Sequence, residues 1–192
     1  MSRVIDDTPQ DDTQRDDTQR DDTGQLEGRL RDIFESRDRG HMQPTIDAFL
    51  QVLAEHPGNA AVLYDVGGSY DTAGQEETAL GYYEQAMAAG LSGDTLRRCL
   101  LQYGSTLRNL SRFDESLAAL DRALELYPRS ESVRMWHALS LHAAGRSDAA
   151  VAALMELAID EIRTDDLLRY EAAVRGNAAY LRELDADGKR ES

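Results

Sequence analysis

The apolar residues of this chain recur three and four positions apart, in stretches of about 13–18 residues that Gly and Pro separate. Alternation of the kind that β-strands show is absent. The pattern predicts nine helices, near residues 26–38, 43–55, 59–73, 76–89, 94–110, 113–126, 131–144, 147–161 and 165–185. Because the predicted connections are short, neighbouring helices are expected to run antiparallel.

The first residues of the chain follow a different pattern. Residues 6–25 read DDTPQ, DDTQR, DDTQR and DDTGQ, a five-residue repeat with no apolar member. A segment with nothing to bury cannot offset its ordering entropy, so residues 1–24 are predicted to be a disordered acidic tail. It is either a charged interaction arm or solubilising segment, or a tandem duplication without a role. Residues 25–185 are predicted to form the helical domain and residues 186–192 a disordered C-terminus.

The helical part contains an internal repeat. The segment that begins at Ala61 aligns with the segment that begins at Arg98, an offset of 37 residues. Gly67 then meets Gly104, and Tyr83 meets Leu120. A shift of 34 residues further brings Ala138, Leu141, Gly145, Ala150 and Leu154 into the same columns, and a shift of 34 upstream brings in Gly40, Phe49, Val52 and Pro57. A fixed period of this size is typical of stacked helical repeats.

The period and its columns resemble the tetratricopeptide repeat family over about residues 26–162, with "RFDESLAALDRALELYP" as the closest match. The resemblance implies an all-α fold: a right-handed superhelical array of antiparallel helix pairs, about four units long. The last predicted helix, with Leu167, Tyr170, Val174, Ala178, Leu181 and Leu184 in one stripe, resembles the family's capping helix. Alternatively, it folds into the groove or docks onto a second copy.

Some columns of the repeat hold small residues and others hold large apolar residues, as this fold requires. Small residues are expected to let the two helices of a unit cross closely, at Gly67, Gly104, Ala138, Ala79, Ser116 and Ala150. Large residues are expected to fill the space between units, at Leu63, Tyr70, Tyr83, Leu100, Leu107 and Leu120. Gly74 and Gly145 suit tight turns, and Pro57 and Pro128 end helices.

The outer units depart from the family pattern. In the first unit the repeat is expected to shift by one residue, so that Leu30 and Phe34 pack. In the last unit Arg134 and His137 fall in core columns, with Trp136 one place away. Terminal repeats are commonly atypical because one side faces water.

The resemblance also implies a concave groove lined by the first helix of each unit. Carried over column by column, its peptide-binding residues are Tyr64, Arg98, Leu101, Ser105, Arg108, Asn109, Met135, Leu139 and His142, with Gly68, Leu30 and Phe34 beside them. The family's clamp for C-terminal carboxylates is missing, because its columns hold Tyr64, Gly68, Ser105, Ser132 and Trp136. The arginines Arg98 and Arg108 suit carboxylate recognition, or they pair with acids of this chain.

Composition narrows the function classes. The chain has 192 residues and a formal net charge of −15, which disfavours nucleic acid and anionic membranes as partners. No apolar run reaches the length of a membrane helix. The single cysteine, Cys99, is expected to be a buried thiol, and a cytoplasmic location is expected. The histidines lack metal-ligand spacing, and no nucleotide, metalloprotease or hydrolase motif occurs.

The sequence therefore predicts a non-catalytic protein–protein interaction module without a cofactor, which binds a peptide or helix segment in its groove. The alternative is a structural homodimer whose groove or capping helix is used for self-association.

Overall fold

Helices make up the folded chain. The computed structural model describes residues 12–188, and within this range it contains ten helices and no strand. These are α1 (Asp12–Glu35), α2 (Gln43–Glu55), α3 (Ala60–Thr72), α4 (Glu76–Ala88), α5 (Gly93–Asn109), α6 (Phe113–Leu126), α7 (Glu131–Ala143), α8 (Ser147–Glu161), α9 (Asp165–Leu168) and α10 (Glu171–Gly188). The predicted bounds of the helices between residues 43 and 161 are confirmed to within one residue.

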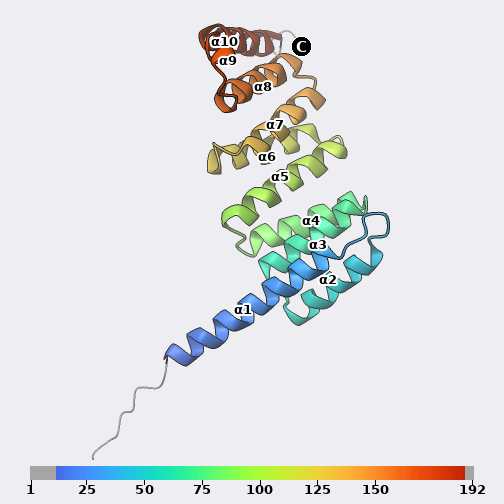
Figure 1. Ribbon diagram of the computed structural model, residues 1–192. Coiled ribbons are helices and arrows are strands. Elements are labelled where there is room, and N and C mark those ends of the chain that lie inside the picture. Colours follow the sequence, from blue (N-terminus) through green and yellow to red (C-terminus); the bar gives the residue numbers. More distant parts are fainter. Residues whose placement is uncertain (1–11, 189–192) are drawn as a thin grey trace, which may run out of the picture.

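The helices stack in one row, from α1 and α2 at one end to α9 and α10 at the other (Figure 1). Within the repeat, α3 pairs with α4, α5 with α6 and α7 with α8, and each pair packs on the next; α10 packs as extensively on α8. The first helices α1, α3, α5 and α7 also contact one another in turn, whereas α2, α4, α6 and α8 share no comparable contact in the described chain. The array therefore bends toward the first helices, as the predicted repeat fold requires.

Two glycines allow the helices of a unit to cross closely. A Cβ on Gly67 would lie 2.8 Å from the ring of Tyr83, and a Cβ on Gly104 would lie 2.7 Å from Cγ of Leu120. Real Cβ atoms do not approach other heavy atoms so closely, so the crossing depends on glycine. Ser116, opposite Gly104, is buried and donates a hydrogen bond of 2.7 Å to the Gly104 carbonyl oxygen. The predicted role of the small-residue columns is confirmed.

The large residues of the repeat form the interior between units. Leu63, Tyr83, Leu100, Leu107 and Leu120 are each at most 5% exposed. Burial of a side chain of this size is worth roughly 1.5–3 kcal/mol. The partly buried Tyr70 stacks on Tyr82, with ring centroids 5.5 Å apart. Cys99 is fully buried, as predicted, and burial raises the pKa of its thiol to about 12.

The same type of turn joins the two helices of a unit in three of the units. Gly74 and Gly145 have φ values of +73° and +77°, and the corresponding residue of the middle unit, Ser111, has φ +61°. In each turn, this residue donates its N–H to the carbonyl three residues back, and the next residue donates to the carbonyl five residues back. This pairing is the Schellman motif, which favours glycine in the left-handed conformation. Ser111 is thus the strained member of the set.

The first helix is longer than the sequence predicted. The sequence pattern places residues 12–24 in a disordered tail, but they are helical and continuous with the part of α1 that packs. A helix that has already nucleated extends at the gain of one backbone hydrogen bond per residue, without needing an apolar face. Residues 1–11 of the predicted tail, and residues 189–192 of the predicted C-terminus, lie outside the described residues.

The packed part of α1 also differs in detail. Leu30 is 6% exposed and packs with Phe49 and Val52, as expected, but Phe34 is 50% exposed. Ile33 contributes to the core in place of Phe34. The guanidinium of Arg37 covers the Phe34 ring at 3.5 Å from its centroid. The expectation that Phe34 packs in the core is wrong.

The predicted helix at 165–185 is broken. Its first turn is the separate α9, and the chain turns at Arg169 and Tyr170 before α10 begins. α10 packs against α8, with Ala178 fully buried, and so caps the array. Tyr170 and Leu184 are 56% and 40% exposed, so the predicted apolar stripe is only partly used.

Ion pairs hold α10 in place. Arg146 lies 2.7 Å from Asp185, whose side chain is 8% exposed, and Arg182 pairs with Glu156 of α8. Arg175 lies 2.8 Å from Asp160, which also binds Arg134 at 2.6 Å. Arg134 can therefore occupy a core column, because its charge is paired at the boundary between α7 and α8.

The close crossing predicts opposite effects for two glycine-to-alanine substitutions. Gly104→Ala should lower the free energy of unfolding by about 1–3 kcal/mol, because the new methyl group meets Leu120. Gly81→Ala, in α4 with no atom within 4 Å of the new Cβ, should raise it by about 0.5–1 kcal/mol. Urea unfolding followed by circular dichroism measures both. Equal effects at the two positions would contradict the packing described.

The strained turn predicts a stabilising substitution. Ser111→Gly should raise the free energy of unfolding by about 0.5–1 kcal/mol, because glycine adopts positive φ without the steric cost that serine bears. The matched reverse change, Gly145→Ser, should lower it by about 1 kcal/mol in the same urea titration. Loss of stability in Ser111→Gly would show that the turn is not strained.

Candidate functional site

The candidate site is the inner face of the first helices. The residues predicted to line it differ in their exposure to solvent. Arg98, Asn109, Met135, Leu139 and His142 are exposed, and Leu101, Ser105 and Arg108 are half-buried. Tyr64 is only 8% exposed and therefore offers little surface to a partner. Leu30, also expected at this face, is buried in the core.

Arg98 is engaged within the chain. Its Nε lies 3.3 Å from Asp94 Oδ2, four residues earlier on α5. Its guanidinium carbon lies 5.6 Å from the centroid of the Tyr64 ring, within reach of a cation–π interaction. Of the two outcomes considered for this arginine, pairing with an acid of the same chain is the one observed.

Arg108 differs from Arg98. Its Nη2 donates a 3.0 Å hydrogen bond to Ser105 Oγ, while its Nη1 is buried without a hydrogen-bond partner. No carboxylate of the described chain lies within ion-pair distance of it. Burial lowers the pKa of Arg108, but an arginine remains charged at neutral pH. A half-buried positive charge without a counter-charge is therefore present on the inner face.

Two further polar groups were not predicted. Gln102 Oε1 is buried without a partner, and Asp65 is half-buried and makes no hydrogen bond or ion pair within the described residues. Burial raises the pKa of Asp65 to about 7, while Arg98 acts in the opposite direction. The 37-residue offset aligns Asp65 with Gln102, so the repeat columns could have identified both.

The C-terminal part of the face is apolar. Met135 and Leu139 are 39% and 42% exposed and lie four residues apart, so they share one side of α7. Leu101 of α5 is half-buried on the corresponding side of the preceding unit. At the edge, Asn109 donates a 3.2 Å hydrogen bond to Glu76. The inner face thus combines apolar side chains with polar groups at its edges.

His137 is not part of the site. It lies in a core column, and its Nε2 is 3.0 Å from Asp121 Oδ1. Burial lowers the pKa of His137, and the neighbouring Asp121 counteracts this only in part. A neutral imidazole costs less to bury than a charged one, so a histidine can occupy this core column in place of the usual apolar residue.

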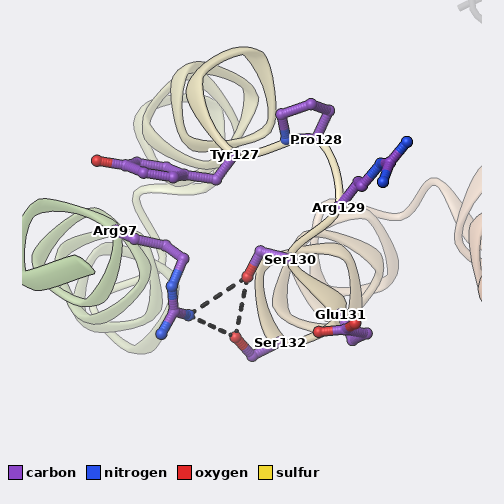
Figure 2. A pocket seen from close by; sticks show the side chains of 7 residues that line it. All are labelled: Arg97, Tyr127, Pro128, Arg129, Ser130, Glu131 and Ser132. Carbon is purple, nitrogen blue, oxygen red and sulfur yellow. Dashed lines mark hydrogen bonds between the residues drawn. The ribbon is translucent and has the colours of Figure 1, made fainter. Parts of the chain in front are cut away.

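A separate hollow of about 730 Å³ lies where α5 meets the loop between α6 and α7 (Figure 2). Its residues are Arg97, Tyr127, Pro128, Arg129, Ser130, Glu131 and Ser132. Arg97 Nη1 donates to Ser132 Oγ at 2.9 Å and to Ser130 Oγ at 3.3 Å, and the guanidinium pairs with Asp94 at 2.7 Å. Its charge is therefore already compensated.

Comparison with known proteins identifies the family. A model of the tetratrico peptide repeat matches residues 60–184. This chain belongs to the tetratricopeptide repeat family. No curated protein matches its sequence.

Two solved structures show the same fold. One is titled "MamA RS-1 ArsTM double mutant", with a TM-score of 0.60 and 11% identity over 88% of this chain and 94% of that one. The other, "Crystal structure of MamA", has a TM-score of 0.58 and 18% identity over 79% and 91% of the two chains. At this identity the likeness concerns the fold alone.

Tetratricopeptide repeat proteins are protein-interaction scaffolds and are generally non-catalytic, which agrees with the class predicted from the sequence. Among the helices of residues 12–188, none is long and apolar enough to cross a membrane. The described residues also contain no group of three or more His, Cys, Asp or Glu that could hold a metal ion.

The half-buried carboxyl of Asp65 predicts a pH-dependent stability. Its pKa is raised from an ordinary 3.8 to about 7, so the folded state favours the protonated form. The free energy of unfolding should fall as pH rises from about 4 to about 7, and Asp65→Asn should remove this fall. At pH 8 the variant should be more stable by on the order of 2 kcal/mol, with the two proteins alike near pH 4.

Urea unfolding of both proteins at pH 4, 6 and 8 measures the effect. Glu125→Gln removes an exposed negative charge on α6 and serves as the control. An equal gain in Glu125→Gln would attribute the effect to net charge and not to burial of Asp65.

Proposed function

We propose that this protein binds a segment of another protein, extended or helical, along the inner face of α3, α5 and α7. The observation that carries the proposal is the exposure of Met135 and Leu139 on α7, in line with the half-buried Leu101 on α5. Large apolar side chains gathered on one face favour association, since burying them stabilises a complex.

The polar surroundings support a protein segment as the ligand. Asn109 and Ser105 offer uncharged hydrogen-bonding groups beside the apolar side chains. An apolar centre with a polar edge is the usual arrangement of a protein interface. The overall charge of −15 disfavours nucleic acid and anionic lipid as alternatives. A reducing, cytoplasmic setting is part of the proposal, because the lone thiol of Cys99 is buried and unable to form an internal disulfide.

Self-association is the second candidate. Four large apolar side chains are exposed on the last helices: Val151, Leu154, Tyr180 and Leu184, between 36% and 57% exposed. A second copy that covered them would make a homodimer through the capping end and leave the inner face free. The two candidates therefore use different surfaces and can be separated by substitution.

We expect Leu139→Asp to weaken capture of the partner from a lysate of the native cell by at least about tenfold, because a charge replaces an apolar contact. Val151→Asp, which introduces the same charge at a similarly exposed position on α8, is the matched control and should capture normally. Quantitative mass spectrometry of the captured protein measures both. Capture that is indifferent to Leu139→Asp would refute the groove assignment.

The homodimer is tested with the same two variants. Light scattering gives the mass in solution at high concentration. A dimer that Val151→Asp dissociates and Leu139→Asp does not would establish self-association through the capping end. A monomeric wild type would remove this candidate.

A further inference from the structure

The repeat offers an internal comparison for the unpaired charge on α5. Asp71 of α3 and Arg108 of α5 occupy the same column, 37 residues apart. Asp71 is satisfied, because it accepts hydrogen bonds from Thr106 Oγ1 at 3.0 Å and from Tyr83 Oη at 3.3 Å. The column therefore lies at a point where one unit meets the next, and polar groups placed there can find partners inside the fold.

The middle unit lacks both of these partners. The column of Tyr83 holds Leu120, which has no polar atom, and the column of Thr106 holds Ser140, which is hydrogen-bonded to Ser116 at 2.8 Å. Arg108 is thus left with Ser105 alone. Two buried side-chain polar atoms of the described chain have no hydrogen-bond partner, and both belong to α5: Arg108 Nη1 and Gln102 Oε1.

An unpaired buried donor destabilises a fold, and a charged one does so more strongly. Nearby acids do not relieve this cost. Glu76, the acid that meets this end of α5, binds Asn109, and no carboxylate of the described residues lies within ion-pair distance of Arg108. A partner that brings its own carboxylate would supply the missing counter-charge in a half-buried place, where charged hydrogen bonds are strong.

We infer that Arg108 anchors the side-chain carboxylate of an Asp or Glu that lies within an otherwise apolar segment of the bound protein. The inference rests on the proposed function, since it assigns a ligand class to the same inner face. Arg108, Ser105 and Leu101 share one side of α5, three and four residues apart. A bound segment whose apolar side chains cover Leu101 and Leu139 also passes close to the guanidinium of Arg108.

The surroundings favour one internal carboxylate over a phosphate or an acidic tract. The next arginine along the chain, Arg112, lies 2.6 Å from Glu115 and 3.9 Å from Glu77, so it is already paired and does not add a free cation beside Arg108. α5 is the middle first helix, with α3 and α7 on its two sides, so a bound chain can continue in both directions. The net charge of −15 also repels polyacidic partners.

The test uses the full-length protein and a displayed library of 12-residue peptides with both ends blocked. Wild type should select peptides with one Asp or Glu among apolar residues. For the tightest peptide, Arg108→Gln should raise Kd about 10–100-fold, the loss expected for a charge-assisted hydrogen bond. Arg122→Gln, which removes an exposed arginine of α6 away from the inner face, is the control and should raise it less than about threefold.

A charge exchange adds a readout that a structural role would not give. Arg108→Glu should prefer the same peptide with Arg in place of its acidic residue. Arg108→Met should lose the preference for an acid while its Tm stays unchanged or rises by up to about 4 °C, because a buried unpaired charge is removed.

The outcomes separate the two proposals. Selected peptides that lose binding in Leu139→Asp, yet carry no common acid or ignore Arg108→Gln, overturn the inference and leave the proposed function standing. A library from which no peptide depends on Leu139 contradicts the proposed function itself. Peptides that bind only through a free C-terminal carboxylate, in a parallel unblocked library, also overturn the inference.

Discussion

The contact between the backbone of α5 at Gly104 and the side chain of Leu120 determines much of this structure. A Cβ at Gly104 would lie 2.7 Å from Leu120, and Gly67 makes the equivalent contact with Tyr83. These approaches turn two helices into one closely packed unit. Because each unit is built alike, the first helices all fall on one side, and their outward-facing residues form a continuous surface. The candidate site is thus a consequence of how small residues are spaced along the chain.

The sequence predicted the interior well, because that interior depends on periodicity. Gly67 and Gly104, with the leucines and tyrosines between them, recur at a constant offset, and this alone indicates stacked helix pairs. The ends were predicted less well. Residues 12–24 extend α1 as a helix without an apolar face, which hydrophobic periodicity cannot detect. The turn at Arg169 and Tyr170 arises where α10 packs on α8, a tertiary effect that overrides local spacing.

In the candidate site, too, the sequence predicted some features and missed others. Column alignment placed Met135 and Leu139 on the inner face, and both are exposed there. It could not distinguish Arg98 from Arg108, because which arginine meets an acid depends on side-chain position in three dimensions. The chain contains 36 acidic residues, so a partner for each arginine was a reasonable expectation. Arg98 has one four residues earlier, whereas Arg108 has no carboxylate within ion-pair distance among residues 12–188.

One column also shows how a repeat array separates stability from recognition. Asp71, Arg108 and His142 occupy equivalent places in three successive units, although one is a carboxylate, one a guanidinium and one an imidazole. The backbone around them is the same, with the matching turn residue three positions later in each unit. Selection can therefore vary this column without disturbing the helix crossing at Gly104. Where the array supplies a partner, as for Asp71, the residue stabilises the stack. Where it does not, as for Arg108, the unpaired charge lowers the stability of the free protein, and a partner with a carboxylate would recover that free energy on binding.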